Sequence, residues 1–92
     1  MTNIMKLMKQ AASMQKNMEK MKDELANQTV EFSSGGGMVT VVAKGDMSIQ
    51  SIKIDPRVID ASDAEMLEDL VLTAVDGALK ASKDMAAKEM SK

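Results

Sequence analysis

The sequence lacks cysteine, histidine, tryptophan and tyrosine, and it has a single phenylalanine and a single proline. The absence of cysteine excludes disulfides, and without cysteine and histidine the usual ligands for zinc, copper and iron–sulfur clusters are missing. No base is placed to activate a serine as a nucleophile. We therefore expect no enzyme: no catalytic site, no metal, no cofactor and no small-molecule substrate.

Long hydrophobic runs are also absent. No stretch approaches the ~20 apolar residues that span a bilayer, and the first residues, with Lys6 and Lys9, lack the apolar run of a signal peptide. We expect a cytoplasmic protein with no membrane partner. A ring-poor chain of 92 residues buries only a modest share of its surface alone, so we expect a second copy to complete the core, as a homodimer.

The N-terminal part has the pattern of a long helix over residues ~3–27, because it contains no glycine or proline and good helix formers dominate it. At 1.5 Å per residue this helix would be about 37 Å long. Its apolar residues alternate at steps of three and four, which is the spacing of a surface that packs on another helix. We call this surface the heptad seam; its members are Ile4, Leu7, Ala11, Met14, Met18, Met21 and Leu25.

The middle of the chain changes period and predicts three strands within residues ~28–54. The Ser33–Gly37 segment and the Gly45-Asp46 pair read as loops between them, so the strands form an antiparallel meander. In the third strand Ile49 and Ile52 have opposite parity, so they would point to opposite faces of a regular strand. Either this strand has a bulge or both of its faces are covered.

A second long helix is predicted over residues ~62–90, where apolar residues return to helical spacing. Asp55-Pro56 ends the last strand, and Ser62 with Glu65 forms a plausible capping box. The expected fold class is therefore α+β: a long helix, a three-stranded antiparallel sheet and a long helix, in one domain spanning residues 1–92.

Charge is segregated along the chain. Residues 1–22 carry five lysines and one glutamate, a net of +4, and residues 77–92 carry four lysines and two acids, a net of +2. Residues 23–76 carry three basic and eleven acidic side chains, a net of −8. If the two helices pack antiparallel on each other, residues 1–10 and 80–92 lie together in one basic tip, away from an acidic body.

Four lysines form a stripe on the first helix, within an arc of roughly 80° almost opposite the heptad seam. They are Lys6, Lys9, Lys16 and Lys20. Such a stripe is commonly just a solvated face. The functional interpretation is phosphate contact, because lysine is a flexible point charge suited to neutralising a nucleic-acid backbone. Antiparallel helices would bring the first two close to Lys83, Lys88 and Lys92.

The eleven methionines also have two interpretations. On a helix seam, methionine usually provides adaptable core packing, and it can instead form a promiscuous docking face. We favour core packing, and we expect Met5 and Met8, at the edges of the seam, to be exposed.

Two other clusters have simple structural interpretations. Gly35-Gly36-Gly37 lacks the Gly-Lys-Ser/Thr ending of a phosphate-binding loop, so it is interpreted as a flexible strand connection. Glu65, Glu68 and Asp69 could serve acid–base or metal chemistry. Acids at a helix N-terminus are, however, favourably placed against the helix dipole, which is the interpretation we prefer.

Several segments together resemble the YbaB/EbfC family of small bacterial nucleoid-associated proteins, over roughly residues 5–80. The matching segments are Leu7-Met8-Lys9-Gln10-Ala11, Met14-Gln15, Ser34-Gly35-Gly36-Gly37, Ile52-Lys53-Ile54-Asp55-Pro56 and Glu65-Met66-Leu67-Glu68-Asp69-Leu70-Val71. The order of the last two behind a methionine-rich helix is specific. The chain differs from many relatives in lacking a glycine-rich lead-in and a tail rich in glycine, proline and phenylalanine.

The resemblance implies a tweezer-like homodimer with a central sheet and projecting helices that bind DNA, with a role in nucleoid organisation and gene regulation. It implies double-stranded DNA as partner and a nucleoid-associated location in the cytoplasm. Lys9 is the only stripe lysine inside a matching segment; the other candidates rest on charge position. The candidate DNA contacts are Lys6, Lys9, Lys16, Lys20, Lys83 and Lys88. The alternative is a dimeric protein-interaction module that uses the methionine-rich helical face.

Overall fold

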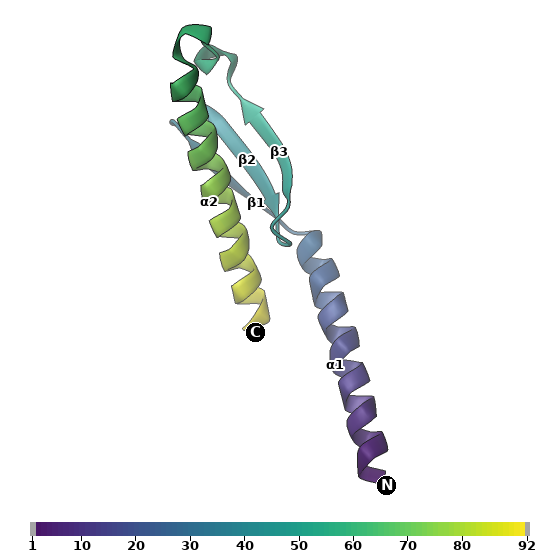
Figure 1. Cartoon of the computed structure of the whole chain (residues 1–92). Helices are drawn as coiled ribbons and strands as arrows, with labels where there is room; N and C mark the ends of the chain where they lie inside the picture. The colour runs from purple at the N-terminus through teal and green to yellow at the C-terminus, as the bar shows by residue number, and fades with distance from the viewer. Residues whose placement is uncertain (1, 92) are drawn as a thin grey trace.

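The computed structural model describes residues 2–91. Its elements are helix α1 (Thr2–Ala26), strands β1 (Thr29–Ser34), β2 (Val39–Lys44) and β3 (Ile49–Ile54), the short 3-10 helices η1 (Pro56–Val58) and η2 (Ala61–Asp63), and helix α2 (Ala64–Met90) (Figure 1). The strands form one antiparallel sheet in the order β1-β2-β3. This arrangement confirms the predicted α+β order of helix, three strands and helix.

Strand β3 contains a bulge. The register with β2 shifts between Val42 and Ala43, which leaves Gln50 without a partner residue across the ladder. Of the two explanations offered for the opposite parity of Ile49 and Ile52, the bulge is the one observed. Both isoleucines consequently lie on the same face of the sheet.

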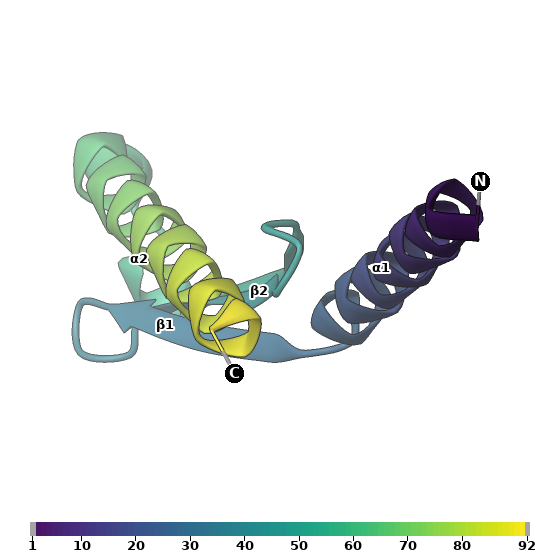
Figure 2. The same cartoon turned by 90° about the horizontal axis from the view of Figure 1, so that it is seen from below.

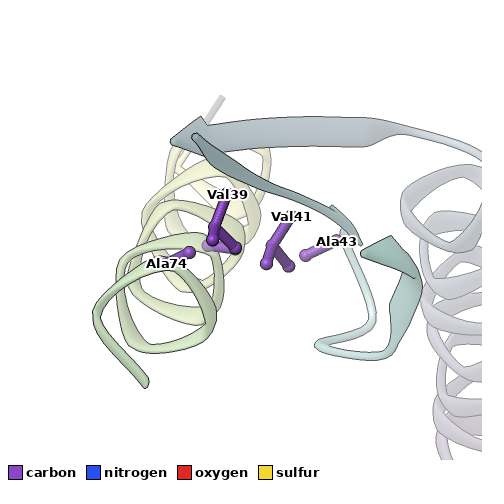
Figure 3. Packing of buried hydrophobic residues seen from close by; sticks show 5 residues of the cluster. Val39, Val41, Ala43 and Ala74 are labelled. Carbon is purple, nitrogen blue, oxygen red and sulfur yellow. The ribbon is translucent and has the colours of Figure 1, made fainter. Parts of the chain in front are cut away.

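Helix α2 lies on one face of the sheet, where it contacts β1 and β2. The core between them is made of small and medium side chains that are fully buried (Figure 3). They are Val39, Val41 and Ala43 from β2, and Ala74 and Ala78 from α2. Small residues on the helix side allow the two backbones to approach closely, so little bulk is needed to fill the space.

Two buried serines connect α2 to the sheet by hydrogen bonds. Ser34 Oγ, at the end of β1, donates to the Leu70 carbonyl at 2.6 Å, and Ser82 Oγ on α2 donates to the Lys44 carbonyl at 2.5 Å. Because these bonds lie at opposite ends of the contact, they fix the position of the helix along the strands.

Gly77 on α2 lies against the ring of Phe32, the only aromatic residue in the sequence. A Cβ added to Gly77 would overlap the Phe32 ring. The sequence pattern makes this glycine a slight weakness in a helix. In the structure it is instead the place where the ring packs against the helix backbone.

Helix α1 is attached to the rest of the molecule only near its C-terminal end. Leu25 is buried, and the Gly45 N–H donates to the Leu25 and Gln28 carbonyls, both at 3.0 Å. Before Leu25, the side chains of residues 3–24 are exposed except for the half-buried Met21. The helix therefore projects from the sheet as an arm, in a molecule that extends 73 × 20 × 16 Å (Figure 1).

The predicted packing of the first helix on the last is wrong for this chain. The apolar face of α2 is already used against β1 and β2, while α1 points away from the sheet (Figure 1). The axes of the two helices diverge in the view of Figure 2. Lys6 and Lys9 therefore do not meet Lys83 and Lys88 in a single basic tip. Lys92, the last member of that expected tip, lies outside the described residues.

The predicted capping box is also displaced. Asp60 accepts from the N–H and hydroxyl of Ser62, so Ser62 belongs to the η2 turn. Asp63 is the N-cap of α2 and accepts from the Met66 N–H at 3.2 Å. The helix thus begins one residue later than a cap at Ser62 would place it, and Glu65 lies in its first turn.

Replacing Gly77 with alanine should destabilise the protein by about 1–3 kcal/mol, because the added methyl group meets the Phe32 ring. Helix propensity alone predicts the opposite sign, a gain of about 1 kcal/mol. Urea denaturation followed by circular dichroism would measure the difference at a fixed protein concentration. Thr73→Ala, at an exposed position of α2, is the matched control. A Gly77→Ala protein more stable than the wild type would contradict this packing.

Candidate nucleic-acid interface

The lysine stripe of α1 is exposed along the arm. All four of its members lie on the exposed part of the helix; they are Lys6, Lys9, Lys16 and Lys20. Because the arm has no packing partner over most of its length (Figures 1 and 2), a ligand can approach the stripe without displacing other parts of the molecule. The structure therefore brings these four together on one accessible surface.

The two remaining candidates form a separate surface. Lys83 and Lys88 are exposed on the C-terminal half of α2, which ends well short of the N-terminus of α1 (Figure 1). Within one chain the α1 stripe and this α2 pair are distinct basic regions on helices that splay apart (Figure 2).

None of the six candidate lysines forms an ion pair within residues 2–91. The ion pairs found there join Arg57 to Asp55 at 2.7 Å and Lys80 to Asp76 at 3.0 Å. A phosphate that approached the candidate lysines would therefore not have to compete with a carboxylate already bound to them. This favours electrostatic contact over a structural role for these side chains.

The acidic end of the molecule lies opposite the arm. The segment from η1 to the start of α2 is at the top of Figure 1, whereas the N-terminus is at the bottom. This segment and the residue just before it contain several acids, namely Asp55, Asp60, Asp63, Glu65, Glu68 and Asp69. This end would repel a polyanion, whereas the lysines of α1 would attract one.

Two of these acids close local turns, and their pKa values fall as a result. The Arg57 side chain donates hydrogen bonds to Asp55, and its backbone N–H adds another, which together lower the pKa of Asp55 from 3.8 to about 2. Hydrogen bonds from Ser62 likewise lower the pKa of Asp60. Both carboxylates have a structural explanation, and no group of acids within residues 2–91 is arranged to hold a metal ion.

The methionines of α1 do not pack a core within the chain, contrary to the interpretation favoured by the sequence. Met5 and Met8 are each 67% exposed, as predicted, but Met14 at 66% and Met18 at 52% are exposed as well. The heptad spacing correctly marks an apolar surface, but not which element covers it. Within residues 2–91, neither α1 nor α2 has the length and apolar character of a membrane-spanning helix.

The whole chain, residues 1–92, matches the YbaB/EbfC DNA-binding family. Bacterial relatives named nucleoid-associated protein align over 90 residues, which is 98% of this chain. The relative from Ruminiclostridium cellulolyticum is 50% identical, and the alignment covers 78% of its length. The relative from Acetivibrio thermocellus is 51% identical with 80% of its length covered, and the relative from Desulforamulus reducens is 53% identical with 86% of its length covered.

A solved structure supports the fold independently of close sequence similarity. An uncharacterized protein of Helicobacter pylori, HP0035, superimposes with a TM-score of 0.80 over 89% of this chain and 86% of its own, at 22% identity. The fold and the sequence define a class of small α+β proteins that bind DNA and are not enzymes. The chain belongs to the YbaB/EbfC DNA-binding family.

The Asp55 carboxyl group should titrate with a pKa of about 2 in the folded protein. Because this value lies below the ordinary 3.8, the contribution of Asp55 to stability is present above about pH 4 and is lost as the pH falls towards 2. A carbon-detected NMR titration of the carboxyl group would measure it. In Arg57→Ala the pKa should return towards 3.8; equal values in the two proteins would contradict the assigned cause.

Proposed function

We propose that this protein binds double-stranded DNA as a homodimer, mainly through the lysines of the projecting helix α1, and acts in nucleoid organisation and gene regulation. The observation that carries the proposal is the exposed α1 stripe of Lys6, Lys9, Lys16 and Lys20, on a helix that projects from an acidic body in a DNA-binding family. The names of its relatives support a nucleoid-associated location in the cytoplasm.

The chemistry of the arm favours duplex DNA bound with little sequence preference. Lysine contacts phosphates as a point charge and carries no planar hydrogen-bonding group for base recognition. The single aromatic residue, Phe32, packs against Gly77 in the body. The arm therefore has no aromatic surface on which the bases of a single strand could stack.

The dimensions of the chain support a homodimer. A compact folded protein of this size exposes about 5,200 Å², whereas the single chain exposes 7067 Å². Its radius of gyration is 19.6 Å, against about 12 Å for a compact domain of equal length. The surplus of about 1,900 Å² is within the range that a subunit buries in an obligate dimer. A second copy would cover apolar surface that one chain leaves open.

Lys6→Glu combined with Lys9→Glu should weaken binding to duplex DNA by about tenfold or more, because attraction to phosphate becomes repulsion. Each phosphate contact that is lost should also reduce the slope of log affinity against log salt by about 0.9. A fluorescence-anisotropy titration at several salt concentrations would measure both quantities, with sedimentation equilibrium as a check that the dimer is intact.

The matched control is Lys44→Glu combined with Lys53→Glu, which changes the net charge equally but on the sheet. We expect it to weaken binding much less. If both double variants lose affinity equally, net charge and not the arm governs binding. Lys83→Glu combined with Lys88→Glu would measure, in the same titration, how much the α2 lysines contribute to DNA affinity.

A second candidate function is a dimeric protein-interaction module, favoured by the 67% exposure of Met5 and Met8. Exposed methionine can adapt to varied apolar partners. Met5→Ser combined with Met8→Ser should leave DNA affinity and dimerisation within twofold of the wild type if DNA is the main ligand. Loss of a co-purifying protein with unchanged DNA affinity would favour the alternative function instead.

A further inference from the structure

One part of the sheet face that carries α2 remains uncovered. Antiparallel partners share a face, so Ile49, Ile52 and Ile54 lie on the same side of the sheet as the buried residues of β2 with which they pair. Helix α2 packs on β1 and β2, with far less contact to β3. Ile49 is therefore 38% exposed and Ile52 47% exposed, beside a half-buried Ile54. We call these three residues the β3 strip.

The bulge is what makes the β3 strip continuous. In a regular strand Ile49 would point to the opposite face from Ile52, since successive side chains alternate. The bulge at Gln50 restores Ile49 to the face of Ile52 and Ile54. The bulge thus places three branched apolar side chains on one open surface. In a single chain this surface is not covered, so these side chains add little hydrophobic stabilisation there.

The heptad seam of α1 is the second open apolar surface. Ile4 is 64% exposed, Leu7 63%, Met14 66% and Met18 52%. The seam cannot fold back onto its own β3 strip while the end of α1 is held to Gly45 through the Leu25 and Gln28 carbonyls, because these bonds point the arm away from the sheet (Figure 1). The β3 strip and the seam can meet only between two copies.

We propose that, in the homodimer, the part of the heptad seam around Met14 and Met18 in each copy packs on the β3 strip of the other. This inference rests on the proposed homodimer and assigns its contact surfaces. The two-fold axis repeats this contact, which covers the β3 strip and the part of the seam nearer the sheet in each chain. It fits the surplus exposed area of the single chain.

Length and charge favour this part of the seam. The six residues of β3 extend about 20 Å, which equals about 13 helical residues, so half of α1 covers the strip and half stays free. If the half nearer the sheet is covered, the N-terminal half still projects with Lys6 and Lys9. The lysine stripe lies almost opposite the seam, so packing of the seam leaves the lysines facing solvent. Methionine suits such a contact, because it adapts to the shape of its partner.

The absence of native cysteine allows a direct test by crosslinking. One chain carries Met14→Cys or Met18→Cys, and a differently tagged chain carries Ile49→Cys or Ile52→Cys. The two chains are mixed, allowed to exchange subunits and treated with a short bismaleimide. We expect crosslinked heterodimers to form at least tenfold faster than with Ile59→Cys as the second partner, since Ile59 is 59% exposed but lies outside both surfaces.

A second measurement does not depend on crosslinking geometry. Ile52→Lys should raise the dimer dissociation constant at least tenfold in sedimentation equilibrium, whereas Ile59→Lys should leave it within twofold. If the wild type is a dimer but neither the crosslinks nor Ile52→Lys show this preference, the contact is placed wrongly and the homodimer stands. A wild type that is monomeric at micromolar concentration would overturn both.

Discussion

The close approach of α2 to β1 and β2 determines the rest of the structure. Ala74, Ala78 and Ser82 present almost no bulk, so the helix lies directly on the valines of β2. Gly77 extends this contact to Phe32 at the side. A helix that fits this closely covers β1 and β2, so the isoleucines of β3 and most of α1 remain exposed.

The residues that build the core and the exposed lysines of α1 thus lie on separate parts of this small protein. The body is held together by few large side chains, and six of its acids lie between Asp55 and Asp69, at the end away from α1 (Figure 1). The positive charge on α1 is not involved in the core. If the stripe lysines contact DNA as proposed, changes to them would alter affinity without disturbing the sheet, which would separate the requirements of binding from those of folding.

The elements were predictable from the sequence because their signals are local. The glycine-rich loop, the alternation of valine and threonine and the opposite parity of Ile49 and Ile52 predicted the strands and left a bulge as one of two explanations. The place of α1 was not predictable in this way. Heptad spacing indicates that a helix has an apolar surface, but it carries no information on which element, or which copy, covers that surface. The role of Gly77 was missed for a related reason, since it depends on Phe32, far away in the sequence.

The weak attachment of α1 has a thermodynamic consequence. Most of the 25 residues of α1 have no tertiary contact within the described part of the chain, so this stretch is held only by the hydrogen bonds of the helix and by residue propensities. Its N-terminal turns should open far more often than the sheet and exchange their amide hydrogens early. Any ligand that binds them also orders them, so part of the binding free energy is used to complete the helix. Folding of the arm is thus coupled to ligand binding.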